Sequence, residues 1–122
     1  VRKNDGKFYS YLNNGTLKFL EINKHLLLAK KLKFGEILIN SIDNDGTGMG
    51  FLNPKLIKKG TDLPIILSGG AGNSCHFELL KNDKISALAT GNLFNFIGEG
   101  LLNLRKDLLK KGINIKSITS NE

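Results

Sequence analysis

The chain has 122 residues, of which 40% are hydrophobic and 24% charged, and its formal net charge is +7. This composition is typical of one globular domain, and no apolar run approaches the ~20 residues that a membrane span needs. The lysines are scattered at spacings typical of the solvated faces and last turns of helices, so neither a nucleic-acid surface nor a membrane surface is expected.

The first predicted element is a β-hairpin. It follows Val1-Arg2-Lys3. The chain begins there without an initiator Met and without the pattern of a secretory signal, so we expect the start to be a cut point. Lys7–Leu12 and Thr16–Phe19 are short runs rich in aromatic and aliphatic residues. Asn13-Asn14-Gly15 lies between them, and Asn-Gly supplies the positive φ angles of a tight turn.

A helix and a buried strand are expected next. Apolar residues recur every three or four positions over Ile22–Leu32, which predicts a helix, and Gly35 stands where a helix stop belongs. Glu36–Ile42 is an almost continuous apolar run, typical of a parallel strand covered on both faces. A polar, glycine-rich loop, Asp43–Gly50, follows this strand.

The pattern of strand, loop and helix then occurs again. The expected parts are a helix over 54–59 capped by Asn53, a strand Pro64–Leu67, a helix Ser74–Lys81, a strand Ile85–Thr90, and a helix Gly98–Lys111 that Gly112 ends. Tandem units of this kind indicate parallel strands joined by right-handed crossovers. The pattern alone fits both an α/β barrel and a doubly wound sheet.

Two glycine-rich turns fall at the predicted carboxyl ends of strands, where both architectures bind ligands. They are Ser68-Gly69-Gly70-Ala71-Gly72 and Thr90-Gly91-Asn92. Glycine lets the backbone approach an anion, and the N–H groups that begin the next helix can point at it. We therefore predict phosphate binding here, although tight turns alone also use such residues. Neither turn has the register of a dinucleotide fingerprint or the lysine of a P-loop.

Few other side chains suggest chemistry. Asp43 and Asp45 would share a face if the strand pleat persisted, and both a catalytic role and an Asx-turn fit them. His25 is expected to be structural and His76 to lie on the surface, and no metal site is expected. Cys75 is the one cysteine, which favours a reducing, cytoplasmic setting.

Three segments, in this order, resemble the sixth, seventh and eighth strands of the HisF family, the cyclase subunit of imidazole glycerol phosphate synthase: Phe34–Thr47, Leu63–Gly72 and Ala87–Phe96. The resemblance covers nearly the whole chain. It implies an α/β fold that is the C-terminal half of a (β/α)8 TIM barrel, with parallel strands preceded by a β-hairpin. Residues 1–122 would form a single partial barrel domain, from the segment after the fifth strand through the eighth helix.

The resemblance also implies roles for site residues. Asp45 would assist catalysis, because the family's main acid and base aspartates end the first and fifth strands and lie outside this chain. Glu36 would be a gate through which ammonia enters the barrel. Substrate and phosphate contacts would come from Asp43, Gly46, Ser68, Gly69, Gly70, Gly91 and Asn92.

The implied function is the lyase and cyclase step of histidine biosynthesis, with ammonia from a HisH-like glutaminase subunit, a phosphorylated ribonucleotide substrate and no cofactor. This chain alone is expected to be inactive. Asn40 and the Tyr9–Thr16 hairpin resemble a HisF-like branch that delivers ammonia for amidination of a surface or flagellar sugar. A third hypothesis is a non-catalytic half-barrel that binds phosphate and self-associates, because half a barrel exposes strand edges and an apolar face.

Overall fold

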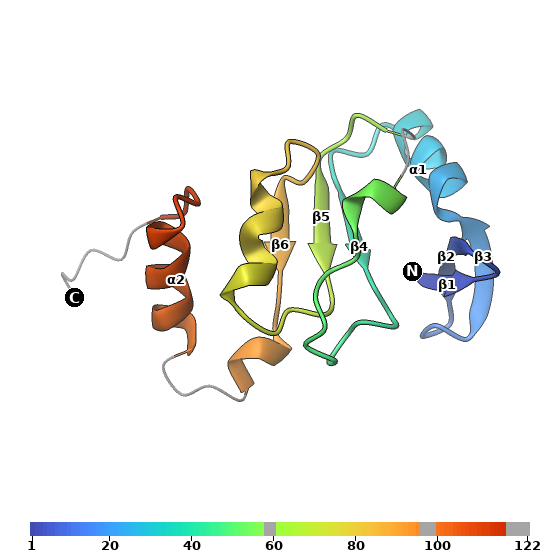
Figure 1. The fold of residues 1–122 in the computed structure, drawn as a ribbon. Helices are drawn as coiled ribbons and strands as arrows, with labels where there is room; N and C mark the ends of the chain where they lie inside the picture. Colours follow the sequence, from blue (N-terminus) through green and yellow to red (C-terminus); the bar gives the residue numbers. More distant parts are fainter. Residues whose placement is uncertain (58–60, 96–99, 117–122) are drawn as a thin grey trace.

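The computed structural model describes residues 1–57, 61–95 and 100–116. Figure 1 shows two sheets, an antiparallel sheet of β1, β2 and β3 beside a parallel sheet of β4, β5 and β6. The predicted end of a helix at Lys59 and the predicted start of another at Gly98 lie outside the described residues.

The first sheet confirms the predicted hairpin and adds a strand. The turn between β2 and β3 has φ angles of 47°, 54° and 84° at Asn13, Asn14 and Gly15. The strand that was not predicted pairs with β2 through Asp5-Gly6, whose φ angles are 49° and 78°. Asp-Gly is itself a hairpin signal, so the sequence contained the information. The three strands are β1 (Arg2–Asn4), β2 (Lys7–Leu12) and β3 (Leu17–Glu21).

Helix α1 (Ile22–Lys31) confirms the predicted helix, but the predicted stop at Gly35 is wrong. Lys33 takes the left-handed conformation, with φ of 59°. The Phe34 N–H then donates to the Ala29 carbonyl at 3.2 Å, which closes the helix end as a Schellman motif. Gly35 has no positive φ angle.

The second sheet confirms the predicted tandem of parallel strands, β4 (Ile37–Asn40), β5 (Ile65–Ser68) and β6 (Ala87–Ala89). Asn40 pairs with Ser68, and Ser68 with Ala89, so the three carboxyl ends are level. Val1 connects the two sheets, because its N–H donates to the Asn40 carbonyl and its own carbonyl accepts from the Ile42 N–H at 2.8 Å.

Helices lie in the segments between and after the parallel strands, and most of them are short. The predicted helix at 74–81 has the expected bounds but is a 3₁₀-helix, and its first bond, from His76 N–H to the Asn73 carbonyl, already spans three residues. Gly112 ends α2 as predicted, with φ of 69°. The helices after β4 are η1 (Pro54–Leu56), η2 (Ser74–Lys81), η3 (Asn92–Asn95) and α2 (Gly100–Lys110).

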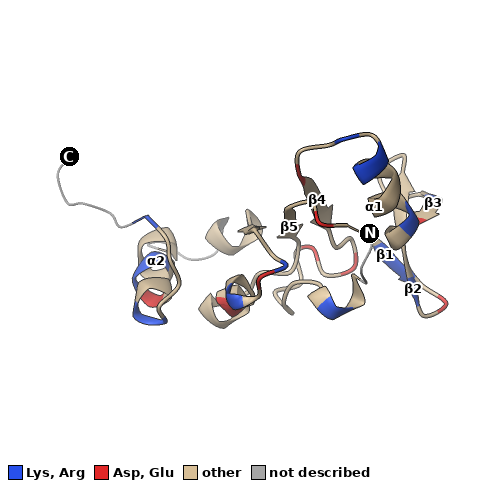
Figure 2. Cartoon of the chain, turned by 90° about the horizontal axis from the view of Figure 1, so that it is seen from above, with Lys and Arg blue, Asp and Glu red and all other residues tan. Residues whose placement is uncertain are grey.

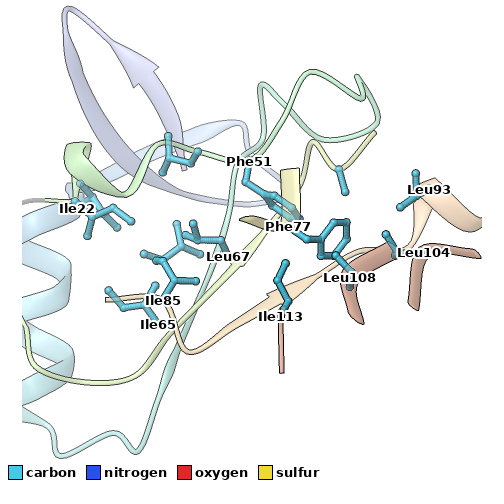
Figure 3. Packing of buried hydrophobic residues seen from close by; sticks show 14 of the residues in the cluster. Ile22, Phe51, Ile65, Leu67, Phe77, Ile85, Leu93, Leu104, Leu108 and Ile113 are labelled. Atoms are coloured by element: carbon cyan, nitrogen blue, oxygen red, sulfur yellow. The ribbon is translucent and has the colours of Figure 1, made fainter. Parts of the chain in front are cut away.

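The core lies where η2 packs against the parallel sheet and α2 packs in turn on η2 and η3 (Figure 3). Leu67 of β5 is completely buried, and the rings of Phe51 and Phe77 meet edge to face, with centroids 5.5 Å apart. Leu104 and Leu108 hold α2 onto this cluster. Because burying one such side chain contributes about 1.5–3 kcal/mol, this cluster fixes the strand ends that carry the candidate site.

The charged residues form no single patch in the part of the chain described. Figure 2 shows the lysines and arginines spread over α1, α2 and the hairpin strands, in agreement with the solvated-face interpretation.

No helix in residues 1–57, 61–95 and 100–116 is long and apolar enough to cross a membrane. The same residues contain no group of three or more His, Cys, Asp or Glu side chains placed to hold a metal ion.

Candidate functional site

The two glycine-rich turns lie side by side at one edge of the parallel sheet. Because Ser68 pairs with Ala89, the turn that begins at Gly69 and the turn that contains Gly91 leave neighbouring strands at the same level (Figure 1). The Asp43–Gly50 loop joins them from β4, since the Ser41 N–H donates to the Ser68 carbonyl at 2.9 Å. This is the carboxyl edge, where parallel sheets bind ligands.

The fold itself requires glycine at two of the predicted positions. Gly69 and Gly70 have φ angles of 85° and 103°, which side chains rarely adopt. A Cβ atom on Gly69 would lie 2.7 Å from the Ser41 carbonyl oxygen, and one on Gly70 would lie 2.0 Å from the Gly50 carbonyl oxygen. The identity of these glycines is therefore explained by packing, and any case for a ligand must come from their N–H groups.

Some N–H groups at this edge are already bonded and others are not. The Gly72 N–H donates to Nδ1 of His76 at 3.0 Å, and the Cys75 N–H donates to Oδ1 of Asn73 at 2.9 Å. The N–H groups of Gly70 and Gly91 donate to no other described residue. The expectation that the whole start of η2 faces an anion is therefore too broad. Fewer amides are free than the sequence suggested.

Gly91 differs from the other two glycines. Its φ angle is not positive, it is exposed, and a Cβ atom there would meet no heavy atom within 4 Å. Neither backbone strain nor crowding in the described structure requires glycine at this position. An exposed turn with an N–H group that is not bonded to another described residue is accessible to an incoming anion.

Asn92 contacts the loop that carries Asp45. Nδ2 of Asn92 donates to the Gly46 carbonyl at 3.3 Å, which connects the turn after β6 to the loop after β4. The exposed Asp45 carboxylate accepts a long hydrogen bond of 3.4 Å from Nδ2 of Asn40. Asn40 thus holds a carboxylate beside the glycine turns, where it can accept a proton or a hydrogen bond.

Asp43 faces the antiparallel sheet in this structure. One carboxylate oxygen accepts from Nε of Arg2 at 2.9 Å, and the other accepts from the Lys3 N–H at 3.1 Å. Both side chains of the ion pair are 42% exposed, so the pair itself contributes about 0–1 kcal/mol. The contact attaches the loop after β4 to β1, and the predicted substrate contact of Asp43 remains a prediction.

Glu36 lies just before β4, at the end of the sheet opposite the glycine turns. It lines a cavity of about 490 Å³ that also touches His25 and Phe34. A larger cavity of about 610 Å³ lies at the amino ends of β5 and β6, beside Pro64 and Ser86. Neither cavity includes the glycine turns, which lie on an open edge of the sheet.

His76 is a site residue that sequence reasoning missed. Its Nδ1 accepts from the Gly72 N–H, and its ring lies 3.6 Å from where a Cβ of Gly50 would be. The histidine was expected to lie on the surface, but it is half buried between the loop after β4 and the turn after β5. The sequence signal for this contact was that His76 follows Gly72 by four residues, which is about one helical turn.

Comparison with known proteins gives one family. A model of that family, described as histidine biosynthesis protein, matches residues 6–99. The chain is 41% identical over 85 residues to the imidazole glycerol phosphate synthase subunit HisF of Flavobacterium johnsoniae, covering 67% of this chain and 34% of that protein. It is 31% identical over 120 residues to the HisF subunit of Chlorobium limicola, covering 95% and 48%. It is 34% identical over 117 residues to the HisF subunit of Thermococcus gammatolerans, covering 92% and 46%.

The chain spans half or less of the length of these relatives. The family match and the parallel β4–β5–β6 sheet confirm the predicted fold class, and the described residues form an open part of a TIM barrel. The chain therefore belongs to the histidine biosynthesis protein family, and the relatives that it resembles are HisF subunits of imidazole glycerol phosphate synthase.

Proposed function

We propose that this chain is part of a cytoplasmic cyclase subunit of imidazole glycerol phosphate synthase. In the proposed reaction, ammonia attacks a bisphosphorylated ribulosyl formimino nucleotide, and ring closure with loss of one water gives imidazole glycerol phosphate and an aminoimidazole carboxamide ribonucleotide. Membership in the histidine biosynthesis family and the names of the relatives support this function. The observation that carries the proposal is the position of the two glycine-rich turns, next to each other at the carboxyl edge.

The phosphate is proposed to bind between these two turns. The N–H groups of Gly70 and Gly91 would donate to its oxygens, together with the side chains of Ser68 and Asn92 and the backbone of Gly69. Hydrogen bonds from fixed amides to a charged oxygen are stronger than bonds between neutral groups, and they need no rearrangement when the ligand binds. The unbonded state of the Gly70 and Gly91 amides among the described residues supports this arrangement.

Ring closure is proposed to take place beside Asp45 and Gly46. The Asp45 carboxylate, held by Asn40, would orient or accept a proton from the substrate, with Asp43 as a further polar contact. The principal acid and base would come from outside these 122 residues, so we expect the chain alone to be inactive. Ammonia would come from a glutaminase partner at the opposite mouth, past Glu36.

A chimera tests the cyclase function directly. The first half of the Chlorobium limicola relative would be joined to this chain, and the conversion of the nucleotide would be followed with ammonium in place of glutaminase. We expect conversion at a measurable rate, with the intact relative as the positive control. Asp45→Asn should lower kcat about a hundredfold, because positioned acid and base groups contribute on that scale.

The phosphate contact is tested in the same chimera. Gly91→Ala should raise KM and change kcat little, because its methyl group enters the space assigned to the phosphate. Gly35→Ala is the matched control, since Gly35 also has open space and an ordinary φ angle but lies near the opposite end of β4. A folded chimera that binds the glutaminase but converts no nucleotide would contradict the cyclase proposal and favour ammonia delivery to another enzyme.

A further inference from the structure

The loop after β4 and the turn after β5 pack backbone against backbone. The Gly50 N–H donates to the Gly70 carbonyl at 2.7 Å, and Nδ2 of Asn44 donates to the Gly50 carbonyl at 2.8 Å. A Cβ on Gly72 would lie 2.2 Å from the Gly48 carbonyl oxygen, so the loop after β4 and the turn after β5 are already in close contact. The position of Gly70 therefore depends on what holds Gly50 and Gly72.

One imidazole ring is bonded to Gly72 and lies beside Gly50. Nδ1 of His76 accepts the Gly72 N–H at 3.0 Å, and Cδ2 and Nε2 of the same ring lie 3.6 Å from the Cβ position of Gly50. In this contact the Gly72 N–H is the donor and Nδ1 is the acceptor. Its place is fixed by the next residue, because Phe77 is 5% exposed and packs edge to face on Phe51.

We propose that His76 is a positioning residue for the phosphate-binding turn: it occupies the Gly72 N–H and supports Gly50, and thereby holds the Gly70 amide in place for a phosphate oxygen. This inference rests on the proposed function. A preformed amide saves the cost of ordering the turn when the ligand binds. His76 itself does not touch the phosphate in this proposal.

The test uses the 122-residue chain and inorganic phosphate. Amide spectra would report binding through Gly69, Gly70 and Gly91, and hydrogen exchange would report the Gly72 N–H. His76→Asn places an amide oxygen close to the position of Nδ1, whereas the longer side chain of His76→Gln does not. We expect His76→Gln to weaken phosphate binding about tenfold and to speed exchange at Gly72, and His76→Asn to restore both to within about twofold.

His25→Gln is the matched control, because His25 lies on α1 and its ring meets the ring of Phe19 in β3 edge to face, away from both turns. If the wild-type chain binds phosphate and His76→Gln binds it equally well with an unchanged Gly72 amide, the positioning role is overturned and the proposed function stands. If the wild-type chain shows no shift at Gly69, Gly70 and Gly91, the phosphate site itself is overturned. If His76→Gln does not fold, loss of affinity in His76→Phe with recovery in His76→Asn supports the same role.

Discussion

Among single residues, Lys111 holds the end of α2 against η2 by an ion pair with Glu78. Nζ of Lys111 lies 2.8 Å from Oε1 of Glu78 and 3.1 Å from Sγ of Cys75. The hydrogen bond from Lys111 lowers the pKa of the Glu78 carboxyl, and the bond to Glu78, followed by the contact with Cys75, raises the pKa of Lys111. The ion pair thus contributes fully to the stability of the fold at pH values between the ordinary pKa values of glutamate and lysine. Its contribution is lost as the pH falls through the lowered value or rises through the raised one.

Lys111→Met should raise the pKa of Glu78 back toward its ordinary value, as measured by carbon NMR of the carboxyl group. Lys110→Met is the control, because that neighbouring lysine is exposed and makes no ion pair with another described residue. The pair is partly exposed, so the effect on stability should be small and should shrink with added salt. An unchanged Glu78 titration in Lys111→Met would show that the ion pair does not form in solution.

The sequence predicted which residue types form the candidate site and at which strand ends they lie, but not the contacts between them. The sequence put Ser68, Gly69 and Gly91 at strand ends because glycine-rich segments follow apolar runs, and the register of the sheet brings these ends together. It could not show that His76 takes the Gly72 amide, because that contact depends on how η2 turns after Asn73. Hydrogen bonds between loops depend on tertiary structure, which periodicity does not encode.

The two long helices end alike but with different residues. Both have a left-handed residue after the last turn and a bond from the next N–H to the carbonyl five residues back, at 3.2 Å in α1 and 3.0 Å in α2. Gly112 fills this position in α2 and Lys33 fills it in α1. Helix α1 therefore carries a strain that α2 avoids, since a side chain in this conformation costs about 1–2 kcal/mol.

Lys33→Gly should raise the free energy of unfolding by up to about 1 kcal/mol, because glycine removes the strain but also frees the unfolded chain. Gly112→Ala should lower it by about 1–2 kcal/mol, since it places a side chain at φ of 69°. Gly35→Ala should change it by less than about 0.5 kcal/mol. Urea denaturation measures all three. Equal stability of Lys33→Gly and the wild-type chain would mean that the strain is relaxed in solution.

Element types were easier to predict than element ends. Apolar runs predicted β4 and β5 correctly, because both faces of a parallel strand are covered. The Asn-Gly pair predicted the hairpin. The stop of α1 was misplaced because glycine is preferred at that position but is not required. The first strand was missed because its three residues, Arg2–Asn4, are polar and form a strand only by pairing with β2.

At the scale of the whole molecule, the parallel sheet has one face without a full layer of side chains over it. Ile39 and Leu67 point to the packed side and are 2% and 0% exposed. Leu38, in register with Ile66, points the other way and is 57% exposed. This face would be the interior of a closed barrel. The periodicity of strands and helices is the same in a barrel and in a doubly wound sheet, so only the family resemblance distinguished the two architectures.

An apolar face of this kind, next to the unpaired edge of β6 in the part of the chain described, favours association of two copies. We expect the 122-residue chain to sediment as a dimer at micromolar concentration. Leu38→Asp should shift it to a monomer, because a charge cannot be buried unpaired between two such faces. Leu12→Asp is the matched control, since Leu12 is a similarly exposed leucine at the hairpin turn. A soluble wild-type monomer at every concentration tested would contradict self-association, and it would mean that the bare face tolerates water.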